Sequence, residues 1–153
     1  MTGDEIRARI EELPVQYEVA YAGQTKRDNW DCDAWRYKIN DIEGDYFTGL
    51  GHRKAHIRAG KNPYPPRTTG SENWNNIHVK PVKPHLADIL YSLFSDAAAL
   101  DMNFKEWCDN YGYDNDSIKA LNIYNQCIDI GYKLCKMFKR EMYDELKELL
   151  YEY

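Results

Sequence analysis

The chain has 153 residues, of which 43% are hydrophobic and 29% are charged, and its formal net charge is −5. This length allows one domain with a substantial core, and the composition excludes a disordered or fibrous protein. No run approaches the roughly 18 apolar residues of a membrane span, and the first residues lack the apolar core of a signal peptide, so we expect no membrane partner and a cytoplasmic location.

The N-terminal pattern predicts a short helix. Thr2 and Glu5 have the spacing of a capping box, and Ile6 and Ile10 fall on one helical face. Pro14 should end this helix, because proline cannot donate the next backbone hydrogen bond.

Three segments then alternate apolar and polar residues with a period of two, which predicts β-strands. They cover residues 15–24, 34–39 and 45–50, and a polar stretch, residues 25–33, lies between the first two. Three short strands joined in sequence most simply form an antiparallel meander.

Residues 51–83 differ in composition from the rest of the chain. A long helix or a central strand is excluded there by Pro63, Pro65, Pro66 and Pro81. We expect an irregular segment with at most a short strand at residues 78–80. Residues 51–85 hold seven Lys/Arg and one acid, a net charge of +6, whereas residues 1–50 carry −5 and residues 86–153 carry −6.

The remaining chain has helical spacing. Pro84 fits the first position of a helix that runs to about residue 100, and Asn103 fits the N-cap of a short helix that ends near Gly112. The longest helix follows, with Asp114 or Asp116 as its cap, and a last helix comes after it.

These elements predict the α+β fold class in a single domain, residues 1–153. We expect a small three-stranded antiparallel sheet with an N-terminal helix (1–50), a basic irregular loop (51–83) and a C-terminal helical bundle (84–153) packed against the sheet.

The longest helix has an apolar stripe with steps of three and four residues, namely Leu121, Tyr124, Ile128, Gly131, Cys135 and Phe138. A glycine in this stripe would let another segment approach closely, at about 1 kcal/mol of helix propensity relative to alanine. None of the cysteines forms a CxxC pair, and we expect buried free thiols rather than metal ligands or a redox pair at Cys32, Cys108, Cys127 and Cys135.

Several short motifs carry a resemblance to a known group of proteins. They are Ala87-Asp88-Ile89-Leu90, Glu106-Trp107-Cys108, Gly112-Tyr113-Asp114 and Asp116-Ser117, together with the Tyr-Phe-Thr-Gly-Leu-Gly-His segment at 46–52. Over much of its length the chain resembles small uncharacterised proteins of phages and prophages, although Ile118 stands where a basic residue is expected. The resemblance implies an origin in a mobile element. Small phage accessory proteins often bind a host machine and block it, as anti-CRISPR proteins do.

Two histidines, His52 and His56, are four residues apart, the spacing of metal ligands on a helix. A third ligand would have to come from elsewhere in the chain, and Gly51 and Gly60 disfavour a helix. We therefore expect no bound metal and interpret the pair as exposed histidines in a basic loop.

Two other patterns are weak signals of catalysis. Residues 49–53 follow a strand and contain glycine and cations, but they are more typical of a turn than of a phosphate loop. Asp31 and Asp33 flank Cys32, and a solvated acidic turn is the better interpretation than a paired-carboxylate or Cys–His site. We therefore expect no enzyme and no cofactor.

The basic loop is one candidate binding surface. Its cations are interleaved with aromatic residues, a mixture that suits phosphate contacts with base stacking: Arg53, Lys54, Arg58, Lys61 and Arg67, with Tyr64 and Trp74. The alternative is that the loop neutralises the acidic helices. Because the whole chain is acidic, direct binding of nucleic acid through residues 51–83 is the alternative function rather than the first.

The other candidate binding surface is acidic and includes Glu106, Asp109, Asp114 and Asp116. It would be drawn to a Lys/Arg-lined channel of a nucleoprotein and would compete there with nucleic acid, unless it is an ordinary solvated helix surface. We predict a phage-encoded inhibitor that binds a host protein or nucleoprotein complex in the bacterial cytosol, with a CRISPR effector as the specific target. A homodimer through the Tyr- and Leu-rich helices is compatible with this function.

Overall fold

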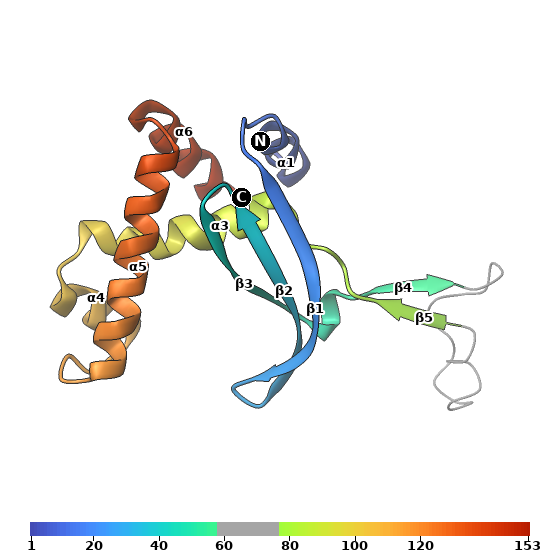
Figure 1. Cartoon of the computed structure of the whole chain (residues 1–153), viewed down its shortest axis with the longest axis horizontal. Helices are drawn as coiled ribbons and strands as arrows, with labels where there is room; N and C mark the ends of the chain where they lie inside the picture. The colour runs from blue at the N-terminus through green and yellow to red at the C-terminus, as the bar shows by residue number, and fades with distance from the viewer. Residues whose placement is uncertain (58–76) are drawn as a thin grey trace. The chain divides into compact units, whose positions relative to one another are not determined.

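The computed structural model describes residues 1–57 and 77–153, with side chains at 1–53 and 80–153 (Figure 1). The chain forms two compact units. The helical unit comprises Met1–Glu18, Lys38–Glu43 and His85–Tyr153, and the β unit comprises Val19–Tyr37 and Gly44–Pro84. An N-terminal helix, a three-stranded antiparallel sheet and a C-terminal helical region confirm the predicted α+β class.

The N-terminal helix α1 spans Gly3–Glu11, as its capping pattern predicts. The side-chain oxygen of Thr2 accepts a hydrogen bond from the backbone N–H of Glu5 at 3.2 Å, which satisfies one of the free donors of the first turn. Ile6 and Ile10 are fully buried on the inward face.

The sheet consists of β1 (Tyr17–Arg27), β2 (Trp30–Ile39) and β3 (Ile42–Gly49), in the order β1-β2-β3. The predicted meander is therefore confirmed, but β1 and β2 extend through most of the polar stretch 25–33. Only Asp28 and Asn29 form the turn, both with positive φ (49° and 69°), as a two-residue hairpin requires. Periodicity missed these strand ends because residues 24–31 are all exposed.

The segment after β3 is more ordered than we predicted. A 3₁₀ turn, η1 (Leu50–His52), leads into β4 (Lys54–Ile57), which pairs antiparallel with β5 (Ile77–Lys80). The prediction of an irregular segment is wrong at residues 54–57, because pairing between distant segments leaves no local signal. The short strand expected at residues 78–80 is confirmed as part of β5.

Helix α3 (Leu86–Ala97) begins two residues later than predicted. Its N-cap is His85, whose Nδ1 accepts the N–H of Ala87 at 2.9 Å while the Asp88 carboxylate accepts the N–H of His85 at 2.8 Å. This reciprocal capping box places Pro84 before the cap rather than at the first helical position. A 3₁₀ turn, η3 (Ala98–Asp101), follows.

Helix α4 (Phe104–Tyr111) is capped by Asn103 and closed by Gly112 at φ 75°, as predicted. Helix α5 (Ile118–Met137) is capped by Ser117, not by Asp114 or Asp116.

The buried face of α5 is rotated from the predicted stripe and consists of Ala120, Cys127, Gly131 and Leu134, followed by Phe138. Leu121 and Cys135 are consequently exposed, which corrects the expectation of a buried thiol at Cys135. The last helix, α6 (Arg140–Tyr151), buries Leu146, Leu149 and Leu150. Helices α1, α5 and α6 all pack on α3, which is therefore central to the helical unit.

Candidate functional site

The four predicted acidic residues lie on α4 and on the connection from α4 to α5. All four are exposed, and we call Glu106, Asp109, Asp114 and Asp116 the acidic surface. Among the described residues, no Lys, Arg or His forms a salt bridge with any of them. The structure therefore leaves their negative charge open to solvent.

Local hydrogen bonds hold two of these carboxylates in place. The amide of Asn103 donates to the Glu106 carboxylate at 2.7 Å while its oxygen accepts the Glu106 N–H at 2.8 Å. The Asp114 carboxylate accepts the N–H of Asp116 at 3.1 Å, which forms a side-chain turn just before α5. Both carboxylates keep further lone pairs for a partner.

An aromatic cluster supports the acidic surface. Trp107 is 4% exposed, and its ring stacks on Tyr113 with centroids 4.9 Å apart and an interplanar angle of 5°. Tyr124 meets the same indole edge-on at 5.5 Å and donates its hydroxyl to the carbonyl of Met102 at 2.7 Å. The outer rings, Tyr111 and Tyr113, remain 52% and 39% exposed. Exposed tyrosines on a rigid base are typical of protein interfaces.

The pKa of the buried Cys108 thiol is raised by its surroundings. Burial raises its pKa most, and the charges of Asp109 and Asp114 raise it further. Cys108 is therefore a neutral core residue under the acidic surface rather than a nucleophile.

The residues predicted for the basic loop are described only in part. Arg58, Lys61, Tyr64, Arg67 and Trp74 lie outside the described residues, and Lys54 is a backbone position in β4. Only the side chain of Arg53 is described, and it faces the interior. Its guanidinium donates two hydrogen bonds to the Asp33 carboxylate, at 2.9 Å and 2.7 Å.

The site around Asp33 corrects the interpretation of residues 31–33 as a solvated turn. Asp33 is fully buried in β2, and the hydroxyl of Tyr21 donates to it at 2.9 Å. The Arg53 hydrogen bonds are the main cause that lowers the pKa of Asp33. A buried carboxylate needs such partners, and its charge is compensated by Arg53. Arg53 is thus engaged within the β unit, whereas its predicted role toward a partner stays a prediction.

The two histidines of the metal hypothesis do not lie on one helix. His52 is exposed at the end of η1, and His56 lies in β4 at the position paired with His78 of β5. In the described ranges, 1–57 and 77–153, no group of three or more His, Cys, Asp or Glu is placed to hold a metal ion.

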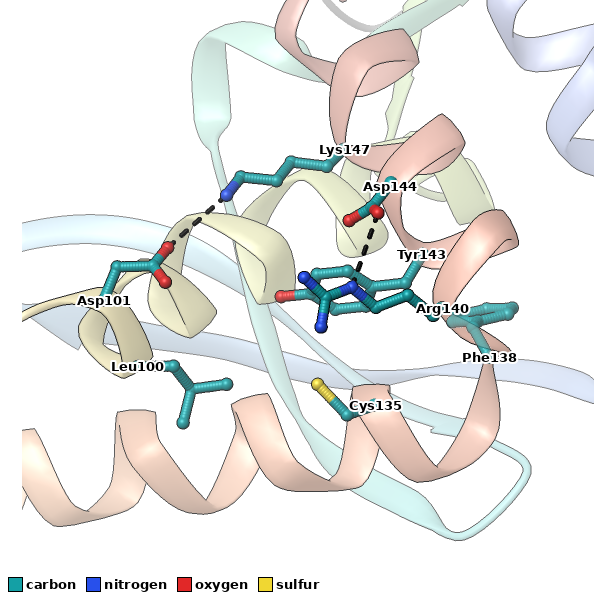
Figure 2. Close-up of a pocket in the computed structure, with 8 residues that line it drawn as sticks. All are labelled: Leu100, Asp101, Cys135, Phe138, Arg140, Tyr143, Asp144 and Lys147. Atoms are coloured by element: carbon teal, nitrogen blue, oxygen red, sulfur yellow. Dashed lines mark hydrogen bonds and ion pairs between the residues drawn. The ribbon is translucent and has the colours of Figure 1, made fainter.

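Sequence reasoning missed a cavity of about 350 Å³ in the helical unit (Figure 2). Its wall consists of Leu100, Asp101, Cys135, Phe138, Arg140, Tyr143, Asp144 and Lys147. The Cys135 thiol and the Tyr143 hydroxyl point into it (Figure 2). Two ion pairs, Arg140–Asp144 at 3.5 Å and Lys147–Asp101 at 3.4 Å, balance its charges. The residues come from three elements, so no local motif could reveal it.

Charge is divided between the two units more sharply than along the sequence. The β unit holds ten Lys/Arg and five Asp/Glu, a net charge of +5, whereas the helical unit holds ten and twenty, a net charge of −10. The structure assigns the acidic segments 1–18 and 38–43 to the same unit as the C-terminal helices. One unit is therefore suited to cationic partners and the other to anionic ones.

Comparison with known proteins adds no family: no family model, curated protein or solved structure matches the chain. Among the described residues, no helix is both long enough and apolar enough to cross a membrane. The phage origin suggested by the sequence motifs stays a prediction.

Proposed function

We propose that this protein is a non-catalytic inhibitor that binds a host nucleoprotein complex through the acidic surface. The observation that supports this most is the exposed group of Glu106, Asp109, Asp114 and Asp116 on a unit with a net charge of −10. A surface of this charge attracts a Lys/Arg-lined groove over distances of about 10 Å at moderate salt.

Inhibition follows from competition. A groove that binds nucleic acid presents cations spaced for phosphates, and fixed carboxylates on a rigid base occupy the same cations. Tyr111 and Tyr113 add apolar area beside the carboxylates. Their rings lose little conformational entropy on binding because the Trp107 cluster already holds them.

The specific target that we propose is a CRISPR effector complex in a bacterial host, as the resemblance to phage proteins suggests. The protein would act in the cytosol and need no cofactor. A homodimer fits this proposal, because Ile118 and Tyr132 leave 77% and 65% of their surfaces exposed on α5. Light scattering of the purified protein measures this assembly directly.

The proposal is tested with the full chain, a purified CRISPR effector and its labelled target DNA. The test variant changes Asp109, Asp114 and Asp116 to asparagine. A matched control changes Glu12, Glu141 and Glu148 to glutamine, three exposed acids of the same unit that lie outside the acidic surface. Both variants lose three negative charges and keep side-chain size.

We expect wild-type protein to bind the effector and to displace its DNA. The test variant should weaken inhibition by about tenfold or more, because it removes local contacts, and the control by about twofold, because it only reduces the long-range field. Absence of binding to the effector, or equal losses in the two variants, would refute the proposal.

Direct binding of nucleic acid through residues 51–83 is the second candidate function. The net charge of +5 on the β unit favours it. It predicts affinity for plain DNA or RNA that falls steeply with salt and that is lost when Lys54, Arg58 and Lys61 are changed to glutamate.

A further inference from the structure

The tip of the β1–β2 hairpin carries the most exposed tryptophan for which the structure describes a side chain. Trp30 leaves 77% of its surface exposed, whereas Trp35 and Trp107 leave 5% and 4%. An indole at a loop tip contributes little to a core, and its apolar face and its N–H group are both accessible to a partner.

Arg27 stands beside Trp30 across the turn. The turn contains only Asp28 and Asn29, and the two residues that flank a two-residue turn are cross-strand neighbours whose side chains share a face of the hairpin. The tip therefore presents one aromatic ring and one cation on the same face.

The guanidinium of Arg27 is held in place by an aromatic ring. It lies 4.2 Å from the centroid of the Phe47 ring of β3, a close cation–π contact. Such stacking covers one flat side of the guanidinium and leaves the N–H groups at its edge free for an acceptor. Because the side chain is already oriented, it loses less entropy when it binds phosphate.

The acidic residues near the tip are arranged differently. Asp28 lies in the turn itself, and Asp31 comes one residue after Trp30, so its side chain projects from the opposite face of β2. Lys26 is the corresponding neighbour of Arg27 on that opposite face. The β unit as a whole has a net charge of +5, which favours an anionic partner.

We propose that the β1–β2 hairpin tip binds single-stranded nucleic acid, with Trp30 stacking on a base and Arg27, braced by Phe47, contacting the adjacent phosphate. A nucleotide combines a flat apolar base with an anionic phosphate, and Trp30 and Arg27 offer the matching ring and cation from one face of the hairpin. The proposed site shares no residue with the acidic surface or with residues 51–83, so it can fail or hold independently of the proposed function.

The experiment measures intrinsic fluorescence of the full chain during titration with oligo-dT and oligo-U at low and moderate salt. We expect quenching by both probes, with weaker binding of a duplex of equal length, because duplex bases are not free to stack. Oligo-U and oligo-dT distinguish a preference for RNA from one for DNA. Changing Trp74 to phenylalanine should leave the quenching in place, so that the signal is assigned to Trp30.

Three variants test the assigned roles. Trp30→Ala should weaken binding about 10- to 100-fold, the range for loss of one stacked base. Arg27→Gln should reduce the salt dependence by about one phosphate contact, whereas Arg36→Gln, an equal charge change at an exposed position of β2, should not. Phe47→Leu keeps every charge, yet it should weaken binding by roughly threefold because Arg27 loses the cation–π contact that orients its guanidinium.

Circular dichroism and thermal melting of each variant show whether the fold is retained. Retained affinity in Trp30→Ala, equal affinity for duplex, or quenching that disappears with Trp74 instead would overturn the proposal. So would the absence of binding to both probes at low salt. Equal effects of Arg27→Gln and Arg36→Gln would mean that only net charge matters and would also refute the assignment.

Discussion

Gly131 on α5 should resist substitution by alanine even though alanine is the better helix former. A Cβ atom at this position would lie 2.5 Å from Cδ1 and 2.6 Å from Cγ of Leu100, where ordinary contacts are 3.4–4 Å. Leu100, which also lines the cavity, would have to retreat by about 1 Å, and overpacking of this kind costs about 1–3 kcal/mol. The gain in helix propensity is about 1 kcal/mol. We therefore expect Gly131→Ala to lower the free energy of unfolding by about 1 kcal/mol.

A double-mutant cycle measured by urea unfolding separates these two contributions. In a Leu100→Ala background the obstructing atoms are absent, so Gly131→Ala should become stabilising by about 1 kcal/mol. Asn125→Ala, at an exposed position of the same helix, serves as a control that changes propensity without changing packing. If Gly131→Ala stabilises the wild-type protein, or has the same effect in both backgrounds, the close approach to Leu100 is not what requires glycine.

Because the pKa of Asp33 is held below its ordinary value of 3.8, chiefly by Arg53, its contribution to stability is present above that pH and is lost as the pH falls through the lowered pKa. Urea midpoints of wild type should therefore drop more than those of Asp33→Asn between pH 5 and pH 2, although the variant starts lower; parallel curves would contradict this. Iodoacetamide at pH 8 should label the exposed Cys135 in the native protein and spare Cys127, whose burial raises its pKa to about 11. Mass spectrometry identifies the labelled residue, and labelling of Cys127 before Cys135 would show that Cys127 is not buried. Asn103→Ala should cost about 1 kcal/mol in thermal melts because α4 loses its N-cap, and an unchanged melt would mean that this cap is not needed.

Helix boundaries were predictable where a few neighbouring residues supply the hydrogen bonds. Thr2 and Asn103 cap α1 and α4 as their spacing predicts. The predicted cap of α5 was wrong because three nearby residues, Asp114, Asp116 and Ser117, are all of the types that cap helices. The hydroxyl oxygen of Ser117 is the one that accepts the N–H of Ala120. Local chemistry sets the kind of cap, and the packing of the buried face selects among neighbours.

The candidate sites were predictable to different degrees. The acidic surface could be found because its four residues lie within eleven positions of one another and are exposed where α4 meets α5. The cavity could not, because Asp101 and Lys147 meet from segments far apart in the chain. The hairpin tip was missed because Trp30 lies in a polar stretch without alternation.

The sequence by itself determined the α+β class, the caps of α1 and α4 and the acidic surface, because hydrogen-bond capping and the periods of 3.6 and 2 act over a few residues. Only the tertiary structure decided that Asp33 is buried and that Arg53 donates hydrogen bonds to it. The two residues are twenty positions apart, and only the folded chain brings them together. The tertiary structure also decided that the acidic segments belong to one unit with a net charge of −10. Charges and ion pairs of this kind depend on which segments become neighbours, which local patterns do not specify.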